Sequence, residues 1–487
     1  MRLGVDFGTT HTVVALVDRG NYPIVSFDHE DVLPSAIAAG PGGELRFGQA
    51  ALAVQREPGW ETLRSVKRLL DTAHAGGMVR LGGRELELAD LLGKFLAWVR
   101  SELVERSNAG IGKGEEIEAA ISVPANASTA QRLVTVDAYR RAGFDVKAVL
   151  NEPSAAGFEY AHRFRETVTS RREYVLVYDL GGGTFDASLI KMEGKSNEVI
   201  TSNGVSRLGG DDFDEAILAL VLEKTRRKEA PAGLLDEIRA QKEALGPNTR
   251  KLVVEVEGHA LSLPVDAVYE ACAPLVEQTL EAMDPAMRDP RREEAGVAWN
   301  ELAGIYVVGG ASSFPPVYRR LRERFGAHRV RRSPHPFGSC AIGLAIHLDT
   351  AAGYQLTERL SRHFGVFRED EGGMRVTFDV LVEKDAQLPA VVTRRYRAAH
   401  NVGHFRFVEC ARIESGRPEG NLALWDEVRF PFDPGLRGEN LAGISVQRLG
   451  NGPEVEEVYR CAADGTVEAS IRVLDDGFEQ TSRIGRR

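Results

Sequence analysis

The chain has 487 residues, which is enough for about three domains and an ample hydrophobic core. Its 43% hydrophobic and 27% charged content is ordinary for a soluble globular protein, and its net charge of −10 argues against nucleic acid or an anionic membrane as a partner.

No apolar run approaches the ~18 residues of a membrane-spanning helix, and the first apolar segment begins almost at Met1, so we expect a cytoplasmic protein without a signal peptide. The four cysteines lack C-x-x-C spacing, which favours reduced thiols over zinc or disulfides.

The N-terminus reads as a strand, a tight turn and a second strand. Leu3 to Val5 is apolar, Asp6 follows, the turn contains Gly8, Thr9 and Thr10, and residues 12–17 are apolar again.

Several ordinary elements follow this hairpin. We expect a short basic helix at 64–71, an amphipathic helix at 86–105, a strand at 117–123 ended by Pro124, a helix at 129–142 capped by Ser128, and a strand at 147–150 before the polar turn Asn151-Glu152-Pro153.

The stretch 174–190, YVLVYDLGGGTFDASLI, repeats the N-terminal design. Gly181, Gly182 and Gly183 let backbone N–H groups approach an anion closely, and Thr184 adds a hydroxyl donor. The aspartates on either side, at 179 and 186, would repel a polyphosphate unless a divalent cation lay between them, so the pattern favours a Mg-nucleotide. A glycine-rich hairpin with solvated aspartates is the plain alternative. Two such hairpins about 170 residues apart indicate an internal duplication, with the nucleotide between the halves.

The next region predicts an outer lobe from Gly204 to about Pro290. Gly209-Gly210 and two aspartates precede a helix that opens at Phe213, and a second helix spans 236–245. A strand at 305–308 then leads through Gly309-Gly310 into a helix near Pro315.

From Met374 the pattern changes to strict alternation of apolar and polar residues. Short strands with turn signals between them, including Asp464-Gly465, predict an all-β module that is most simply a sandwich.

Six segments in order carry a resemblance to the heat shock protein 70 chaperones. They are DFGTT (6–10), SVPAN (122–126), NEPSAA (151–156), DLGGGTFD (179–186), LGGDDFD (208–214) and VVGGASSFP (307–315). The resemblance implies an actin-like, duplicated ribonuclease-H-like α/β ATPase domain at 1–350, a linker at 351–365 and a small β-sandwich domain at 366–487. Within the linker, only Leu356 and Leu360 match the family's leucines.

The resemblance also implies roles for individual residues. Lys67 would lie by the γ-phosphate, Asp6 and Asp179 would hold Mg²⁺ through water, and Pro124 and Arg132 would relay the nucleotide state to the substrate domain. The implied catalytic residues are Lys67, Glu152, Asp179, Thr184 and Asp186. The implied nucleotide-binding residues are Gly8, Thr9, Thr10, His11, Gly181, Gly182, Gly183, Thr184, Gly209, Gly210, Lys242, Gly309, Gly310 and Ala311.

The sequence departs from the family near the base. Glu243 stands where the family has arginine, Gly246 where it has serine, and His335 where it has aspartate, which puts the contacts to adenine and ribose in doubt. The β module resembles the family's substrate-binding domain at 382–397 and 459–470. The chain stops at Arg487 without the helical pattern of a lid, so we expect fast peptide exchange.

The expected function is that of an ATP-dependent chaperone, whose slow hydrolysis of Mg-ATP is coupled to binding of unfolded polypeptide segments. The implied partners are client polypeptides, a J-domain cochaperone and a nucleotide exchange factor. Two alternatives remain: a nucleotide-gated protein-binding module with negligible hydrolysis, and a sugar kinase of the same superfamily.

Overall fold

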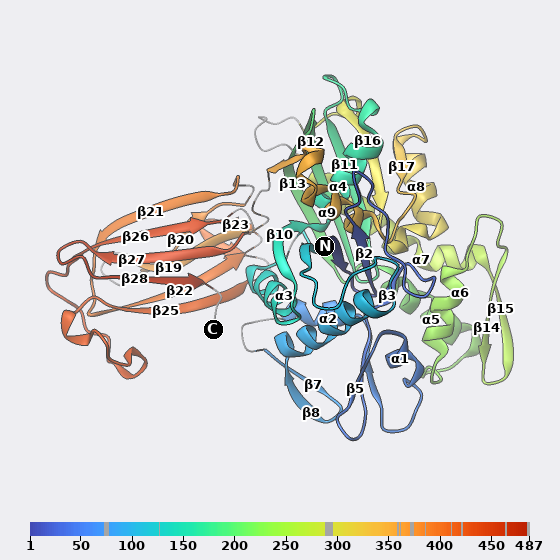
Figure 1. Ribbon diagram of the computed structural model, residues 1–487, viewed down its shortest axis with the longest axis horizontal. Coiled ribbons are helices and arrows are strands. Elements are labelled where there is room, and N and C mark those ends of the chain that lie inside the picture. Colours follow the sequence, from blue (N-terminus) through green and yellow to red (C-terminus); the bar gives the residue numbers. More distant parts are fainter. Residues whose placement is uncertain are drawn as a thin grey trace. The chain divides into compact units, whose positions relative to one another are not determined.

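The computed structural model (Figure 1) describes residues 1–72, 77–125, 127–287, 296–357, 360, 362–370, 375–384, 386–410, 412–419, 422–462 and 465–484. Asn126, Met374, Asp464 and three residues of the expected linker (358, 359 and 361) lie outside these ranges. Within them, no helix is long and apolar enough to cross a membrane. The chain forms two compact units. Unit 1 comprises Met1–Thr72, Met78–Asn126 and Val136–Leu356, and unit 2 comprises Ala73–Gly77, Ala127–Thr135 and Thr357–Arg487.

Unit 1 contains two mixed sheets with the same design. In the first, β1 and β2 form an antiparallel hairpin, and β9 and β10 continue the sheet in parallel from β1. In the second, β11 and β12 form the hairpin, and β16 and β17 continue in parallel from β11. The first sheet has the order β10 (Asp145–Asn151), β9 (Glu118–Val123), β1 (Arg2–Phe7), β2 (His11–Leu16), β3 (Leu33–Pro34). The second has the order β17 (Val330–Arg332), β16 (Leu302–Val308), β11 (Tyr174–Leu180), β12 (Thr184–Glu193), β13 (Ser196–Ser206), β18 (Gln355–Thr357). This matching order agrees with the duplication inferred from the two glycine turns.

Helices α4 (Glu152–Arg163) and α9 (Ser339–Leu348) join the two sheets. Helix α9 packs on β1, β2 and β9, α4 packs on β11 and β12, and the two helices pack on each other. A Cβ added to Gly343 of α9 would lie 1.7 Å from the carbonyl oxygen of Ala155, and one added to Gly4 of β1 would lie 2.2 Å from that of Ala341. These two glycines therefore allow the backbone of α9 to pack directly against the backbones of α4 and β1, which holds both hairpins against a common core.

The N-terminal region contains several further elements. The predicted amphipathic helix at 86–105 is confirmed as α2, which buries its apolar stripe, although its first turn begins two residues later than expected. In order along the chain these elements are β4 (Ile37–Ala39), β5 (Leu45–Phe47), α1 (Gly48–Ala53), β6 (Glu61–Leu63), a 3-10 helix (Val66–Thr72), β7 (Met78–Leu81), β8 (Arg84–Glu87), α2 (Leu88–Glu105) and α3 (Thr129–Arg141).

Helices α5, α6 and α7 lie beside the β14–β15 ribbon and are coloured green in Figure 1. Their apolar faces share one core with the second sheet. The elements are α5 (Gly210–Thr225), α6 (Leu234–Glu243), β14 (Lys251–Val256), β15 (His259–Pro264), α7 (Val265–Ala286) and α8 (Pro315–Phe325).

Unit 2 contains two four-stranded antiparallel sheets that share one hydrophobic core. The core takes Phe364, Phe407 and Phe430 from one sheet and Val455 and Ile471 from the other. One sheet has the order β20 (Arg375–Val382), β19 (His363–Asp370), β22 (Val402–Cys410), β25 (Ala423–Pro431). The other has the order β21 (Ala390–Arg397), β26 (Glu454–Cys461), β27 (Val467–Val473), β28 (Glu479–Ile484), and β23 (Arg412–Glu414) pairs with β24 (Arg417–Glu419).

A buried charge network connects the two sheets of unit 2. Arg368 of β19 pairs with Asp379 of β20 at 2.7 Å and with Glu457 of β26 at 2.6 Å. Glu457 is fully buried and also accepts hydrogen bonds from the hydroxyls of Tyr396 and Tyr459. Every oxygen of this buried carboxylate is therefore compensated, as burial of a charge requires.

Candidate functional site

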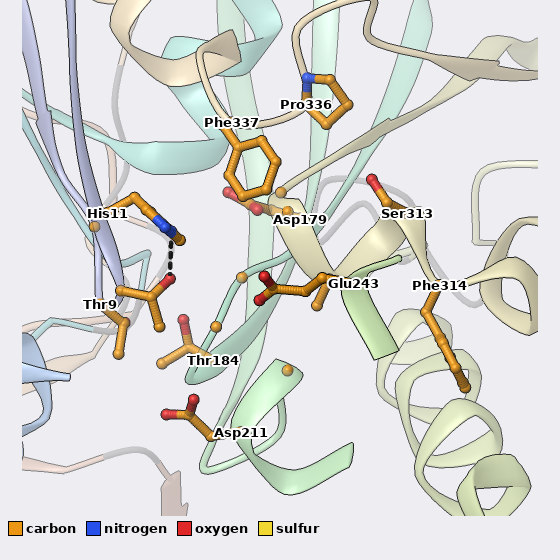
Figure 2. Close-up of a pocket in the computed structure, with 18 of the residues that line it drawn as sticks. Thr9, His11, Asp179, Thr184, Asp211, Glu243, Ser313, Phe314, Pro336 and Phe337 are labelled. Atoms are coloured by element: carbon orange, nitrogen blue, oxygen red, sulfur yellow. Dashed lines mark hydrogen bonds between the residues drawn. The ribbon is translucent and has the colours of Figure 1, made fainter. Parts of the chain in front are cut away.

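A cleft with a volume of about 390 Å³ opens in unit 1, at the ends of the two hairpins (Figure 2). The structure brings sixteen of the predicted site residues to its walls. They are Asp6, Gly8, Thr9, Thr10, His11, Lys67, Glu152, Asp179, Gly181, Gly182, Thr184, Gly210, Lys242, Gly309, Gly310 and Ala311.

The two glycine turns are closed in the same way and touch each other. The N–H of Gly8 donates to the carbonyl of His11 at 3.0 Å, and the N–H of Gly181 donates to that of Thr184 at 3.0 Å. A Cβ on Gly182 would lie 2.5 Å from the side chain of Thr10, so the absence of a side chain allows this close approach. The cleft therefore has two facing backbone turns, each suited to an anionic group.

The first turn of α5 forms a further wall. The N–H groups of Gly210 and Asp211 donate to the carbonyls of Gly181 and Gly182, at 3.0 and 2.8 Å. Lys242 of α6 donates to the carbonyl of Gly210 at 2.7 Å and pairs with Asp214 at 2.7 Å. Its ammonium thus ties α6 to α5 as well as lining the cleft.

Lys67 and a group of carboxylates occupy the buried end of the cleft. Lys67, on the 3-10 helix, is 6% exposed and forms an ion pair with Glu152 at the start of α4. Asp6 accepts a hydrogen bond from the Ser122 hydroxyl at 2.6 Å. Burial would lower the pKa of Lys67, but the charges of Glu152 and Asp6 outweigh it and raise that pKa. The ammonium is therefore held in its charged form.

Three of the carboxylates, Asp6, Asp179 and Asp186, have pKa values raised by burial and by their neighbours. Burial and the charge of Glu152 raise the pKa of Asp6 to about 6 and that of Asp186 to about 8. The same causes raise the pKa of Asp179 well above its ordinary range. When they are ionised, these carboxylates outnumber the positive charge of Lys67, so a divalent cation fits the donor set. Among the described residues, no group of three or more acidic, His or Cys side chains is placed to hold a metal ion.

The turn after β16 brings another backbone edge to the cleft. Gly309 has φ +82°, and a Cβ there would lie 2.3 Å from the carbonyl oxygen of Leu180. A left-handed backbone in such close contact requires glycine. Gly310 and Ala311 follow it into the cleft.

Several predicted residues lie outside the cleft lining. Gly183, Gly209 and Asp186 adjoin the second turn without lining the cleft, and Pro124 and Arg132 do not line it either. His335 is exposed. Neither His335 nor Gly246 lines the cleft, whereas Pro336 and Phe337 do. The structure thus places Phe337, and not His335, at this wall.

Sequence reasoning missed several lining residues. Arg239, Ser313, Phe314, Phe337 and Cys340 all line the cleft. These residues lie close in sequence to the predicted motifs, and this closeness could have suggested that they line the cleft. Which of these neighbours faces inward depends on how α6, α8 and α9 pack.

The amino-acid sequence matches a family model and several known proteins. The model described as "Hsp70 protein" matches residues 78–360. A "Chaperone protein HscA homolog" from Laribacter hongkongensis is 34% identical over 72% of this chain and 59% of its own length, and one from Azoarcus sp. is 34% identical over 74% and 59%. The "Heat shock 70 kDa protein BIP3" of Oryza sativa subsp. japonica is 29% identical over 99% of this chain and 74% of its own length. The chain spans about 59% of the HscA homologues it matches. The chain belongs to the Hsp70 family, whose ATPase domain has the actin-like fold.

Proposed function

We propose that this chain binds a Mg-nucleoside triphosphate, in the first instance ATP, and hydrolyses it slowly as a chaperone ATPase. The proposal rests on one observation. The two glycine turns meet in one cleft, which the buried Lys67–Glu152 ion pair also lines. Two facing turns offer backbone N–H groups to the phosphates, and the acidic end accommodates a cation.

The reaction is attack of a water oxygen on the γ-phosphorus, with cleavage of its bond to the β–γ bridging oxygen. Lys67 places a positive charge beside the transferred group and stabilises the charge that develops on its oxygens. Asp179, Asp186 and Glu152 orient the water, and a carboxylate of this set takes up its proton. Thr184 donates its hydroxyl to a phosphate oxygen. Asp6 and Asp179 would hold Mg²⁺ through water, and the ion would supply positive charge to the phosphates.

We further propose that the C-terminal region is a β-sandwich that binds unfolded polypeptide. The proposed boundaries are an ATPase domain at 1–350, a linker at 351–365 and the sandwich at 366–487. The shared core of the two four-stranded sheets of unit 2 supports this assignment. Client polypeptides, a J-domain cochaperone and a nucleotide exchange factor are the proposed partners, and Pro124 and Arg132 the proposed relay.

The altered surroundings of the base site favour a second candidate. Glu243 lines the cleft where the family has arginine, and Phe337 lines it two residues after His335, which stands where the family has aspartate. In this alternative, the nucleotide is held with negligible hydrolysis and gates the binding of one protein by unit 2.

Single-turnover hydrolysis of Mg-ATP tests both candidates. Wild type, Asp179→Asn, Lys67→Ala and the control Lys113→Ala, which changes an exposed lysine, are compared with and without an extended hydrophobic peptide. The chaperone ATPase predicts hydrolysis by wild type and control, a rate altered by peptide, and a loss of about 10²-fold or more in both cleft variants. Tight ATP binding without hydrolysis under every condition would refute the catalytic assignments and support the gated binding module.

A further inference from the structure

One segment of this acidic chain is strongly basic. Residues 315–332, PPVYRRLRERFGAHRVRR, contain seven arginines and one glutamate, whereas the whole chain has a net charge of −10. The segment forms α8 and β17, and α8 packs on both β17 and α7 in unit 1 (Figure 1). A surface of opposite sign to the rest of the molecule attracts anionic partners to one place.

The arginines next to α7 are balanced by acidic residues. Arg320 pairs with Glu277 of α7 at 2.7 Å and with Glu323, the glutamate of the segment, at 2.9 Å. Arg324 pairs with Asp284 of α7 at 2.8 Å. These arginines therefore attach α8 to α7, and they offer little charge to a partner.

The other exposed arginines of the segment are not balanced in this way. Arg319, Arg322 and Arg332, which we call the arginine face, are exposed and form no ion pair with a carboxylate among the residues that the structure describes. None of the three lines the nucleotide cleft. The arginine face is therefore separate from the site proposed above.

Aromatic rings order two of these side chains. The guanidinium of Arg319 lies 5.6 Å from the ring centroid of Tyr269 on α7, and that of Arg322 lies 5.5 Å from the ring centroid of Tyr318. A guanidinium over a ring keeps its N–H groups available for hydrogen bonds. Because these side chains are already ordered, binding costs less side-chain entropy.

Contacts between α8 and β17 place the arginines in a row. Arg332 donates a hydrogen bond to the hydroxyl of Ser313, just before α8, and the hydroxyl of Tyr318 donates to the carbonyl of Val330 at 3.3 Å. Arg322 lies one turn after Tyr318, so the row is roughly 10 Å long at ~1.5 Å per helical residue. In an extended peptide, alternate side chains share one face at intervals of about 7 Å. Two or three acidic side chains of a short segment therefore match the row.

We propose that the arginine face binds a short acidic segment of a partner protein, whose carboxylates accept hydrogen bonds from the guanidiniums. A long polyanion such as nucleic acid would extend beyond the row, over a molecule whose remaining charge is negative and repels it. A short acidic peptide meets the arginines without this repulsion.

Fluorescence anisotropy tests the proposal with the full chain and without nucleotide. The probe is a fluorescein-labelled decapeptide of alternating aspartate and glutamate, and a labelled decapeptide of serine and glycine is its uncharged control. We expect saturable binding of the acidic probe at low ionic strength, weakened by added salt, and no binding of the control peptide.

Two triple variants separate the arginine face from net charge. Arg→Gln at all three positions of the arginine face should weaken binding of the acidic probe at least about tenfold. The control triple removes the same charge from exposed arginines elsewhere in unit 1, by Arg80→Gln, Arg140→Gln and Arg171→Gln, and should bind as wild type does. Thermal unfolding shows that each variant is folded.

Three results would overturn the proposal. The first is the absence of saturable binding of the acidic probe at low ionic strength, and the second is an equal loss of binding in the two triple variants. The third is tighter binding of an oligonucleotide of the same charge, lost with the arginine face, which would assign this surface to nucleic acid. None of these results depends on nucleotide binding or hydrolysis.

Discussion

Replacing Asp186 by asparagine should stabilise the nucleotide-free protein, and the gain should grow with pH. Asp186 is 4% exposed on β12 and lies directly opposite Asp179 of β11 in the hairpin. Burial and the charge of Glu152 raise its pKa from 3.8 to about 8. The folded state thus binds a proton that the unfolded state releases above pH ~4.

The magnitude of this effect follows from the pKa shift. One pKa unit corresponds to about 1.4 kcal/mol, so raising the pKa from 3.8 to about 8 costs wild type about 5 kcal/mol at pH 8, where the group is half protonated, and almost nothing below pH 4. Asparagine has no such cost, although a buried amide without partners costs about 1–3 kcal/mol. The variant should gain about 2–4 kcal/mol at pH 8, a rise in melting temperature of roughly 3 °C or more.

The assay is thermal unfolding between pH 5 and 8.5, in EDTA and without nucleotide. Glu229→Gln, which changes an exposed loop carboxylate, serves as the control and should follow wild type at every pH. A melting-temperature difference that does not change with pH, or a variant less stable than wild type at pH 8, would refute the assigned electrostatics.

Three further predictions concern the turns, the cation and unit 2. Gly209→Ala should reduce nucleotide affinity at least about tenfold, because a Cβ there would lie 2.7 Å from the backbone of Gly182, which cannot yield without moving the turn. The matched control is Gly112→Ala, where an added Cβ would lie 3.6 Å from the Glu115 carboxylate, an ordinary contact distance. This variant should bind a fluorescent N-methylanthraniloyl nucleotide as wild type does. Removal of Mg²⁺ with EDTA should weaken ADP binding in the same assay, since the acidic end of the cleft then repels phosphate, and unchanged affinity would contradict the proposed ion. Arg368→Leu should lower the free energy of unfolding of unit 2 by about 3–5 kcal/mol in urea denaturation, because Glu457 is left buried without its cation, although two tyrosine hydroxyls still donate to it. The double change with Glu457→Leu should recover much of the loss.

The two hairpins could be predicted because their signals are local. An apolar run, an aspartate, a glycine turn and a second apolar run specify strand, turn and strand within about fifteen residues, and β1–β2 and β11–β12 have this form. The alternating pattern after residue 374 likewise predicted strands such as β20, β21 and β26. The alternating pattern did not predict which strands pair with each other. Strand β19 pairs with β22 some forty residues later, and alternation alone carries no information about which strands meet.

The sequence by itself therefore determined that this chain has two glycine-containing turns, each preceded by an aspartate, an amphipathic helix at 86–105 and an alternating C-terminal region. Only the tertiary structure decided which neighbours of these motifs face the cleft. Phe337 lines the cleft and His335, two residues earlier, does not, while Glu243 is exposed next to Lys242, whose ammonium pairs with Asp214. Such choices depend on how α5, α6 and α9 pack against the two sheets, and packing between distant segments leaves no periodic trace in the local sequence.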